Sequence, residues 1–394
     1  MKKIMILGAS IYQVPLIKKA KEMGLYTIVC SIEGNYPGFT FADKVYYVNT
    51  IDKEKILEVA KEEQIDGICT TGTDVAVITI GYVCEQMGLS GISYASAQIA
   101  TNKAKMKQCF FENGVPTAAF RVVHSEQEAL EAFDTLRKPV VMKIVDKSGS
   151  RGIYRVDDRA QVAEVFADEL KQTGKPYIVI EEFINGHEVG VDALVQNGEV
   201  KLLLGHDKLM HRSGKATIPV GHILPMMQNE TVTKRLEDVS RGLIRAMKLD
   251  NCAVNMDVFV TAEEEIFVIE AGGRAGATGI PEVMGIYSGS NYYEQVIKIA
   301  LGEEIVLKEL VKTPCASALF HAKETGILKN VSFPELDGVE YSVDYPIGNR
   351  VNAMEDGTDR IGQAIVWADT MEALQQKIER ILQETVIEVS SNEF

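Results

Sequence analysis

The sequence predicts a mixed α/β and α+β chain in three parts. Over residues 1–93, apolar runs of strand length alternate with amphipathic helices, which is the pattern of a doubly wound parallel sheet. Residues 94–310 combine hairpins with longer helices, as expected of a larger second domain. From about residue 311 the strands are short and a single helix follows them, which indicates a small α+β domain over 311–394.

Composition excludes several classes of function. The chain has 394 residues, of which 46% are hydrophobic and 25% charged, as in ordinary globular proteins. A net charge of −15 argues against a nucleic-acid partner or an anionic membrane surface. No apolar run approaches membrane-spanning length. The six cysteines include no CxxC pair, so we expect buried free thiols and a cytoplasmic protein.

The first part is expected to hold four strands with helices between them. The strands are predicted at 3–7, 26–30, 44–48 and 65–70, and the helices at 14–23, 53–63 and 76–87. After the first strand, Gly8-Ala9-Ser10 could hold a phosphate, but a single glycine makes a nicotinamide dinucleotide site a weak hypothesis. Residues 70–74 end the fourth strand, where they could contact a polar substrate or cap the next helix.

A lysine lies inside the apolar strand predicted over residues 138–145, after helices at 104–113 and 125–136. Lys143 shares a face with Val141 and Val145, so its ammonium needs a partner, and a phosphate would be one. The following loop, residues 146–152, is rich in hydrogen-bond donors and precedes another strand at 153–156. It would act as a flap over phosphates, or it is a plain surface hairpin.

The middle of the chain continues with a helix at 157–173, a strand at 177–180, a hairpin over 189–204 and a helix at 231–247. Residues 206–222 are predicted to be polar and irregular. They contain three of the six histidines and also Lys208, but their spacing fits no common zinc pattern. We expect a loop on the substrate side or ordinary surface there.

An acidic hairpin is predicted over residues 251–270. Two apolar runs flank the turn at 261–265, and alternation places Asn255 and Asp257 on one face of the first strand and Ile266, Val268 and Glu270 on one face of the second. Folding about the turn sets Asp257 nearly opposite Glu270. Two carboxylates about 5 Å apart repel each other unless a hard cation such as Mg²⁺ lies between them. Otherwise they are two solvated acids.

A glycine-rich turn with one arginine follows Glu270 directly. Its backbone amides and Arg274 suit a phosphate or a carboxylate, and a helix begins near Pro281. The rest of the chain is predicted to form a helix at 290–301, strands at 316–321, 339–343 and 362–367, a helix at 371–384 and a strand at 385–389.

The order of these segments resembles the ATP-grasp superfamily of carboxylate ligases. The resemblance is to the branch with biotin carboxylase, the large chain of carbamoyl phosphate synthetase, the formate- and bicarbonate-using purine enzymes and the L-amino acid ligases. It implies a pre-ATP-grasp parallel-sheet domain over 1–93, a split ATP-grasp domain over 94–310 with a lid at about 120–184, and a small C-terminal α+β domain over 311–394.

The resemblance also implies roles for residues. Lys103 and Lys143 would bind the phosphates of ATP, Glu181 to Ile184 would clamp adenine, and Glu188 would bind ribose. Asp257 and Glu270 would hold Mg²⁺ or Mn²⁺, and Arg274 would be catalytic. The residues implied for ATP are Lys103, Lys143, Ser148, Gly149, Ser150, Gly152, Glu181, Glu182, Phe183, Ile184 and Glu188.

Two positions depart from the family pattern. Asn102 stands where the family has Asp, and Gly272 stands where many members have Asn as a further metal ligand. The second departure leaves the geometry of a second metal open.

The function implied is an ATP-dependent carboxylate–amine ligase. A small carboxylic acid or amino acid would attack the γ-phosphate, giving an acylphosphate and ADP, and an amine would then displace phosphate. The expected partners are these small molecules and, because family members are often dimers, a second copy of the chain. The alternatives are a biotin carboxylase-like enzyme, a purine-biosynthesis carboxylase or formyl ligase, a non-catalytic ATP sensor suggested by Gly272, and a nicotinamide oxidoreductase.

Overall fold

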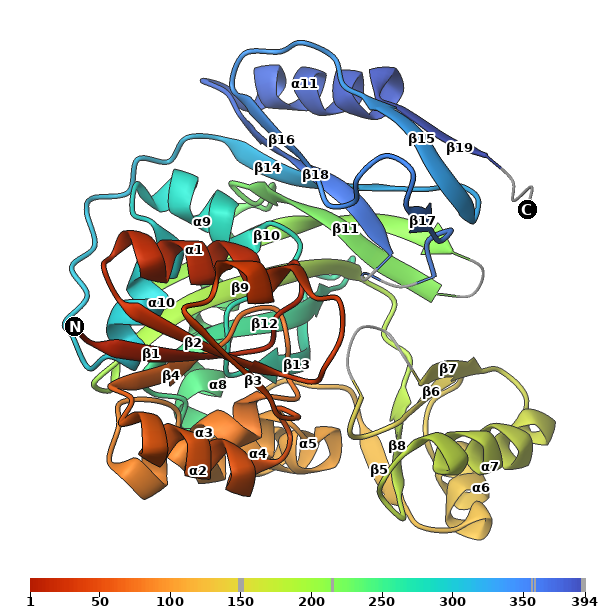
Figure 1. Ribbon diagram of the computed structural model, residues 1–394. Helices are drawn as coiled ribbons and strands as arrows, with labels where there is room; N and C mark the ends of the chain where they lie inside the picture. The colour runs from red at the N-terminus through yellow and green to blue at the C-terminus, as the bar shows by residue number, and fades with distance from the viewer. Residues whose placement is uncertain (148–151, 214–215, 356, 358, 391–394) are drawn as a thin grey trace.

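The computed structural model describes residues 1–147, 152–213, 216–355, 357 and 359–390. The described residues form four sheets, and the helices pack on their faces (Figure 1). One four-stranded sheet is parallel, and the other three sheets are antiparallel, so the mixed α/β and α+β class predicted from the sequence is confirmed.

The amino-terminal sheet is parallel, with strand order β3-β2-β1-β4. Its side chains alternate between two cores, because Ile4 and Ile6 pack with α1 on one face while Met5 and Leu7 pack with α2 and α3 on the other. The elements are β1 (Lys3–Leu7), α1 (Val14–Glu22), β2 (Tyr26–Ser31), a 3₁₀ helix (Pro37–Phe41), β3 (Lys44–Tyr47), α2 (Lys53–Glu63), β4 (Gly67–Cys69), α3 (Val77–Met87) and α4 (Tyr94–Ala100).

The turn after β1 is filled by a side chain of the protein. Ser10 donates from its backbone N–H and its hydroxyl to Gln13 Oε1, at 2.9 and 2.7 Å. Gln13 Nε2 in turn donates to the carbonyl of Thr71 at 2.5 Å. Gly8 has φ +97, and a Cβ there would lie 2.9 Å from the Gln13 side chain. Because Gln13 takes up the donors that a dinucleotide phosphate would need, the nicotinamide hypothesis loses its structural basis.

A small antiparallel sheet with order β5-β8-β6-β7 stands apart from the rest of the chain, at the lower right of Figure 1. Its helices α6 and α7 share one apolar core with it. The elements are β5 (Phe120–Val123), α6 (Glu126–Thr135), β6 (Val140–Lys143), β7 (Ile153–Val156), a 3₁₀ helix (Arg159–Gln161), α7 (Val162–Gln172) and β8 (Ile178–Glu182). We call this unit the lid sheet.

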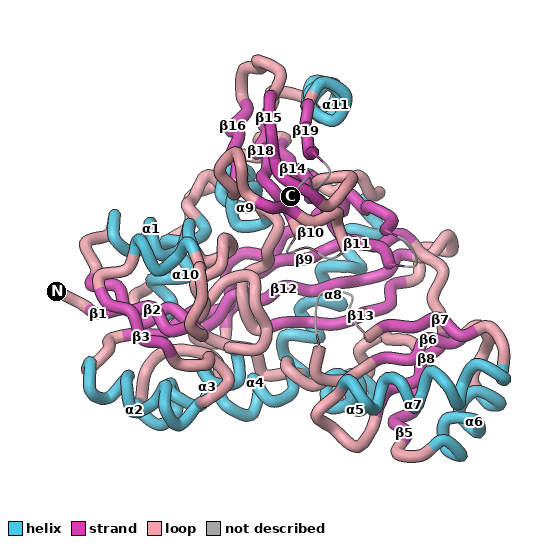
Figure 2. Tube along the Cα trace, turned by 45° about the vertical axis from the view of Figure 1, so that its right-hand side comes forward, coloured by secondary structure: helices cyan, strands magenta, loops and turns pink. Residues whose placement is uncertain are grey.

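An eight-stranded antiparallel sheet, β13-β12-β9-β10-β11-β14-β18-β16, occupies the centre of the molecule (Figure 2). Helices α8 and α10 contribute to cores on its two faces. The elements are α5 (Lys103–Glu112), β9 (His187–Gln196), β10 (Glu199–Ser213), β11 (Ala216–Leu224), α8 (Glu230–Ala246), β12 (Cys252–Val260), β13 (Ile266–Gly272), α9 (Ile280–Ser288), α10 (Tyr292–Ala300), β14 (Cys315–His321), β16 (Val339–Val343) and β18 (Arg360–Trp367).

The prediction that residues 206–222 are irregular was wrong, because β10 and β11 form a long antiparallel pair there. Polar residues mark the region, yet His206, Lys208 and His222 are at most 7% exposed. Their polar atoms are paired with other side chains across the sheet, so these residues sit in strands without the usual apolar alternation.

The carboxyl-terminal part contributes to two sheets. Its strands β14, β16 and β18 extend the eight-stranded sheet, while a three-stranded sheet, β17-β15-β19, packs with α11. The sequence analysis missed two of these strands, β15 (Gly326–Ser332) and β17 (Arg350–Val351); the remaining elements are α11 (Met371–Glu384) and β19 (Val386–Ser390). The domain boundaries at residues 93 and 310 stay predictions.

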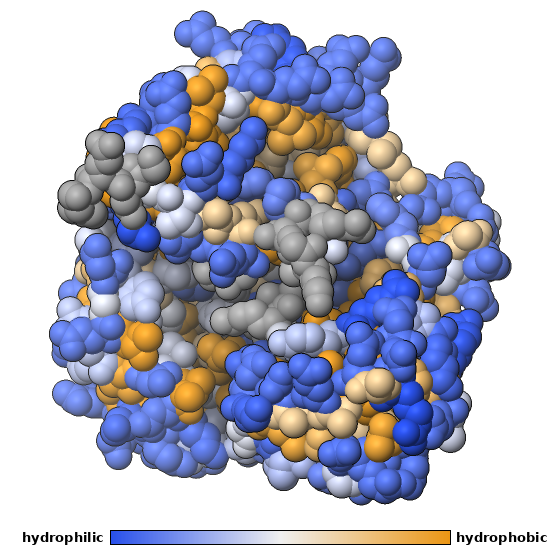
Figure 3. Space-filling view, turned by 90° about the vertical axis from the view of Figure 1, so that its right-hand side faces the viewer, coloured by the Kyte–Doolittle hydropathy of each residue, from blue (hydrophilic) through white to orange (hydrophobic). Residues whose placement is uncertain are grey.

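The surface and the cysteines agree with the compositional expectations. All six cysteines, each within the described residues, are buried free thiols, as predicted. Figure 3 shows hydrophilic residues over much of the face that carries the lid sheet, with apolar patches between them. Within the described part of the chain, no helix combines the length and apolar character needed to cross a membrane.

Two glycine substitutions test the packing of this fold in opposite directions. A Cβ at Gly67 in β4 would lie 2.5 Å from the carbonyl oxygen of Ala300 at the end of α10, whereas one at Gly242 in α8 would meet nothing closer than 4.0 Å. We expect Gly67→Ala to lower the free energy of unfolding by about 1–3 kcal/mol through overpacking. Gly242→Ala should raise it by about 0.5–1 kcal/mol, because alanine favours a helix interior. Urea unfolding measures both, and a neutral Gly67→Ala would contradict the close approach of α10.

Candidate active site

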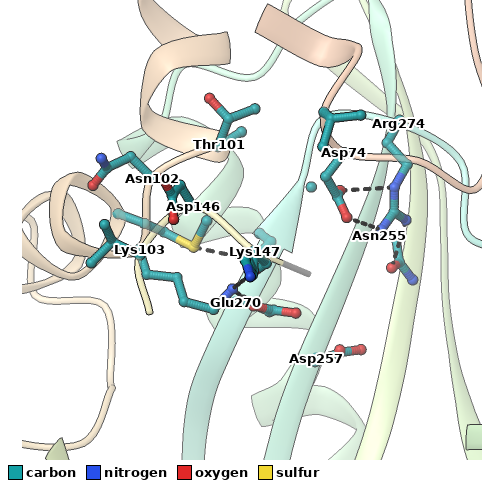
Figure 4. Close-up of a pocket in the computed structure, with 16 residues that line it drawn as sticks. Asp74, Thr101, Asn102, Lys103, Asp146, Lys147, Asn255, Asp257, Glu270 and Arg274 are labelled. Carbon is teal, nitrogen blue, oxygen red and sulfur yellow. Dashed lines mark hydrogen bonds and ion pairs between the residues drawn. The ribbon is translucent and has the colours of Figure 1, made fainter. Parts of the chain in front are cut away.

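An open pocket of about 570 Å³ lies where α5, the end of the lid strand β6 and the β12–β13 hairpin meet. Figure 4 shows the polar side chains that line it. Four residues predicted for the site, Lys103, Asp257, Glu270 and Arg274, are among them. The pocket therefore brings together residues more than 150 positions apart in sequence.

A β-bulge places the two predicted metal carboxylates side by side. In β13, Ile269 is an extra residue, so Asp257 pairs with Glu270. Regular pairing would have set Asp257 opposite Ile269 and turned Glu270 toward the core. The predicted pairing of Asp257 with Glu270 is confirmed, but the predicted face of the second strand was wrong. Ile266 and Val268 point into the core, whereas the bulge turns Glu270 to the pocket.

Two lysines, of which Lys208 is buried and Lys103 partly buried, contact these carboxylates. Lys208 Nζ lies 2.5 Å from Asp257 and 2.6 Å from Glu188, and Lys103 Nζ lies 2.9 Å from Glu270. Burial lowers the pKa of Lys208, but the two carboxylates raise it more, so the ammonium stays charged. Burial raises the pKa of Glu270, but Lys103 outweighs it and lowers that pKa to about 2. Burial raises the pKa of Asp257.

The donor set fits magnesium shared with a ligand. In the described part of the chain, no group of three or more His, Cys, Asp and Glu side chains could hold a metal ion. Mg²⁺ is, however, commonly bound by one or two carboxylates together with waters and substrate phosphates. Asp257 and Glu270, adjacent on neighbouring strands and facing the pocket, meet that requirement. Gly272 supplies no side-chain oxygen.

Lys143 is buried in the lid sheet with an unexpected partner. Its ammonium contacts Glu181, and Lys107 of α5 lies 2.7 Å from the other oxygen of the same carboxylate. Burial raises the pKa of Glu181, but the two ammonium groups outweigh it and lower that pKa to about 2. The adenine clamp predicted for Glu181 used backbone groups and stays a prediction, and its side chain serves as the counter-charge for Lys143 and Lys107.

The backbone N–H groups at the end of β8 and just after it are partly taken up by the protein itself. Glu182 N–H donates to the carbonyl of Ala119 and Phe183 N–H to that of Pro139, at 2.9 and 3.0 Å. The N–H of Ile184 has no hydrogen-bond partner among the described residues. An adenine clamp at this segment would therefore use the Ile184 amide as its donor.

The glycine loop is only partly described. Ser148, Gly149 and Ser150 lie outside the described residues. Gly152 closes the base of the loop, where its carbonyl accepts from Ile144 N–H at 3.0 Å. A Cβ at Gly152, which has φ +66, would collide with the Ile144 side chain, so only glycine fits there.

Arg274 joins the glycine-rich turn to the amino-terminal sheet. Its Nε and Nη2 lie 2.9 Å from the two carboxylate oxygens of Asp74, and its Nη1 donates to Asn255 Oδ1 at 2.9 Å (Figure 4). A Cβ at Gly272 would lie 2.7 Å from Asp74 Oδ1. The glycine at this position thus leaves room for the carboxylate that orients Arg274.

Other residues of the site were missed by the sequence analysis. The sequence analysis placed Lys208 in an irregular stretch. Its alternation with His206 along one apolar segment was the signal that could have indicated a strand face. Asp74 was left between substrate contact and helix capping, and its carboxylate in fact pairs with Arg274. Asn255 had been placed on the face of Asp257 without a role. Asn102, the family departure, is the N-cap of α5, where its side chain accepts from Lys105 N–H at 3.1 Å.

A model of the ATP-grasp domain matches residues 136–282. The chain is 23% identical over 322 residues to an alanine–anticapsin ligase of Bacillus subtilis, covering 75% of this chain and 67% of that protein. It spans between 58% and 67% of the length of the first curated relatives that it matches.

Solved structures match the whole chain. A phosphoribosylglycinamide synthetase from Anaerococcus prevotii is 27% identical with a TM-score of 0.84, covering 99% of this chain and 100% of that one. The biotin carboxylase domain of the Hydrogenobacter thermophilus 2-oxoglutarate carboxylase, solved as a dimer with MgADP, ADP and bicarbonate, is 17% identical with a TM-score of 0.83, covering 99% and 91%. The first match and the domain model confirm the resemblance drawn from the order of the motifs. Residues 136–282 of the chain are therefore identified as an ATP-grasp domain.

Proposed function

We propose that the protein is an ATP-dependent ligase that joins a small carboxylic acid to an amine. The observation that carries this proposal is the bulge-enforced pair Asp257 and Glu270, which faces a pocket lined with Lys103 and Arg274. Paired carboxylates beside fixed cations suit a metal–triphosphate ligand. The likeness to an alanine–anticapsin ligase over 75% of the chain supports the same class of reaction.

Several cations would together compensate the negative charge of the ATP phosphates. Lys143 on the lid sheet and Lys103 on α5 approach the pocket from different elements, so closure of the lid over ATP would bring both to the phosphates. Magnesium bound by Asp257 and Glu270 would neutralise charge on the β- and γ-phosphates. Lys208 would balance the negative charge of Asp257 and Glu188, since its ammonium lies between them.

Arg274 would steady the acyl group. Asp74 and Asn255 fix its guanidinium at the pocket wall, so the orientation is set before a substrate arrives. The substrate carboxylate would attack the γ-phosphate, and the resulting acylphosphate would react with the amine and release phosphate. No side-chain nucleophile is needed for either step.

A second candidate is synthesis of phosphoribosylglycinamide. The observation that favours it is the 27% identity to a synthetase of that name across the full length of both chains. Such a reaction also joins a carboxylate to an amine, so the two candidates differ in substrate and share the chemistry. A homodimer remains a prediction in either case.

Release of ADP provides the test of this proposal. Mg-ATP is incubated with pools of amino acids and small carboxylates, and separately with glycine and a phosphoribosyl amine, and ADP and phosphate are measured. We expect Glu270→Gln and Asp257→Asn to lower carboxylate-dependent release at least about 100-fold, equivalent to about 2.7 kcal/mol. Glu265→Gln, at the exposed turn of the same hairpin, is the matched control and should behave as wild type.

Other product patterns would contradict the proposal. AMP and pyrophosphate would indicate adenylation instead of an acylphosphate. ATP binding without carboxylate-dependent release in any pool would favour a sensor. Wild-type release in Glu270→Gln would remove the metal-site assignment.

The buried Lys143–Glu181–Lys107 cluster predicts a pH-dependent stability. Because the pKa of Glu181 falls from 4.5 to about 2 on folding, its contribution is on the order of 3 kcal/mol. That contribution is fully present above about pH 4.5 and is lost as the pH falls from 4.5 toward 2. Glu181→Gln should therefore destabilise the protein at pH 7, with the difference from wild type narrowing below about pH 4.5.

Urea unfolding at pH 7, 5.5, 4.5 and 3.5 measures this difference. Glu58→Gln, an exposed position on α2, is the control and should show no such narrowing. A difference between Glu181→Gln and wild type that stays constant down to pH 3.5 would contradict the ionised cluster.

A further inference from the structure

One carboxyl group is buried without a partner in the core of the lid sheet. Glu169 of α7 follows Val162 and Phe166 on the face of the helix that packs on the sheet, and it is 0% exposed. Neither of its carboxyl oxygens has a hydrogen-bond partner among the residues that the structure describes. An unpaired polar group at such a position costs free energy, and folded proteins retain few of them. Glu169 therefore calls for an explanation other than packing.

The charged groups around Glu169 do not compensate it. Lys143 and Glu181 of the lid sheet alternate with the apolar residues of this core, so they point to the opposite face. Glu182, at the end of β8, is paired with Arg137. The remaining titratable groups on α6, β7, the 3₁₀ helix before α7 and α7 itself are exposed, and they are Glu126, Glu128, Glu131, Asp134, Tyr154, Arg155, Arg159, Glu164, Asp168 and Lys171.

The protonation of Glu169 depends on whether its carboxyl group stays buried. Burial raises the pKa of Glu169 from 4.5 to about 8, so the group is protonated in the folded lid sheet at neutral pH. Because the buried carboxyl holds its proton more tightly than an exposed one, a rise in pH favours any state in which Glu169 reaches water. This preference grows between about pH 4.5 and pH 8 and stays constant at higher pH.

The last turn of α7 connects Glu169 to the pocket of the proposed active site. The N–H of Thr173 donates to the carbonyl of Glu169 at 3.1 Å and closes this turn. Thr173 Oγ1 and the N–H of Gly174 donate to the two carboxylate oxygens of Asp146, at 2.7 and 2.9 Å. Asp146 lines the pocket (Figure 4). Unwinding of the turn would therefore remove two donors from a carboxylate of the pocket.

The two neighbours of Asp146 contact Lys103 at the start of α5. The carbonyl of Val145 accepts from the N–H of Lys103 at 3.0 Å, and the carbonyl of Lys147 accepts from Lys103 Nζ at 2.6 Å. Lys103 also pairs with Glu270. Asp146 thus lies between two backbone contacts that position a proposed phosphate-binding lysine. A change at the end of α7 reaches this lysine through adjacent residues and printed contacts only as far as the strand end allows, so the anchor at Asp146 is the critical connection.

We propose that Glu169 makes the lid sheet a proton-dependent latch. In its protonated form, the carboxyl group stays in the apolar core and α7 keeps its last turn. When the proton passes to solvent, the carboxylate moves to water, the turn unwinds, and Asp146 loses its contacts with Thr173 and Gly174. The lid sheet then holds a nucleotide less tightly at alkaline pH. Only this last step rests on the proposed function.

Amide hydrogen exchange tests the latch without any ligand. Exchange over residues 162–174 is followed by mass spectrometry between pH 6 and pH 9 and corrected for the intrinsic effect of pH on exchange. We expect protection of the last turn of α7 to fall at least about tenfold from pH 6 to pH 8. The fall should level off above pH 8, because Glu169 is then ionised in the closed form as well.

Two variants remove the titrating group. Glu169→Gln preserves the size of the side chain, and Glu169→Leu places an apolar side chain in the apolar core in case the buried amide prevents folding. In both variants, the corrected protection of the last turn should not change with pH. Glu164→Gln, at an exposed position of the same helix, is the matched control and should lose protection with pH as the wild type does.

Binding of Mg-ADP tests the connection to the pocket. Calorimetric titrations at pH 7 and pH 9 compare the wild type with Glu169→Leu. We expect the Kd of the wild type to rise at least about threefold over this range, because only the fraction of molecules with an intact lid sheet binds tightly. The rise should be absent in Glu169→Leu, whose side chain cannot ionise.

The outcomes separate this inference from the proposed function. Protection that is constant with pH in the wild type, or that falls equally in Glu169→Leu, would overturn the latch. A pH-dependent loss of protection with the same change in Kd in both proteins would overturn the connection to the pocket. Absence of Mg-ADP binding at either pH would overturn the proposed function and the last step together, whereas the exchange result decides the latch by itself.

Discussion

The site depends on the way carboxylates at and below the pocket are compensated by cations that are buried or partly buried. Asp257 and Glu188 share Lys208, Glu270 faces Lys103, Glu181 lies between Lys107 and Lys143, and Asp74 holds Arg274. Glu181, Lys107, Lys143 and Lys208 are buried, and an unpaired charge at such a position costs several kcal/mol. These pairs join the amino-terminal sheet, α5, the lid sheet and the eight-stranded sheet, and the compensation that permits the charges to be buried also fixes the elements around the pocket.

The pairing has a consequence for how a nucleotide would be held. Lys143 reaches Glu181 within the lid sheet, while Lys107 reaches the same carboxylate from α5. A triphosphate entering the pocket would compete with Glu181 for Lys143 and with Glu270 for Lys103. Binding is then an exchange of partners among fixed charges, and the cations need little reorganisation.

Much of the arrangement could be predicted because it is local. Alternating polarity located β1, α2, β7, β16 and α11 to the residue, since their periodicity needs no distant partner. The same reasoning failed at residues 206–222, where the strands carry His206, Lys208 and His222 in buried positions. The partners of these side chains lie on other segments and are Asp192, Asp257 and Thr278. Because the pattern of the local sequence contains only the polar residues and not their partners, it led to the prediction of a loop.

The amino-acid sequence by itself determined most of the strands and helices and made Asp257, Glu270 and Lys143 candidates, because residue type and short-range spacing carry that information. Lys103 became a candidate only through the resemblance to a known family. Tertiary structure alone decided that the bulge at Ile269 turns Glu270 to the pocket, that Asp74 fills the space beside Gly272, and that Glu181 is a counter-charge. These features depend on which distant side chain occupies the neighbouring space. A buried polar group that lacks such a partner lowers the stability of the fold.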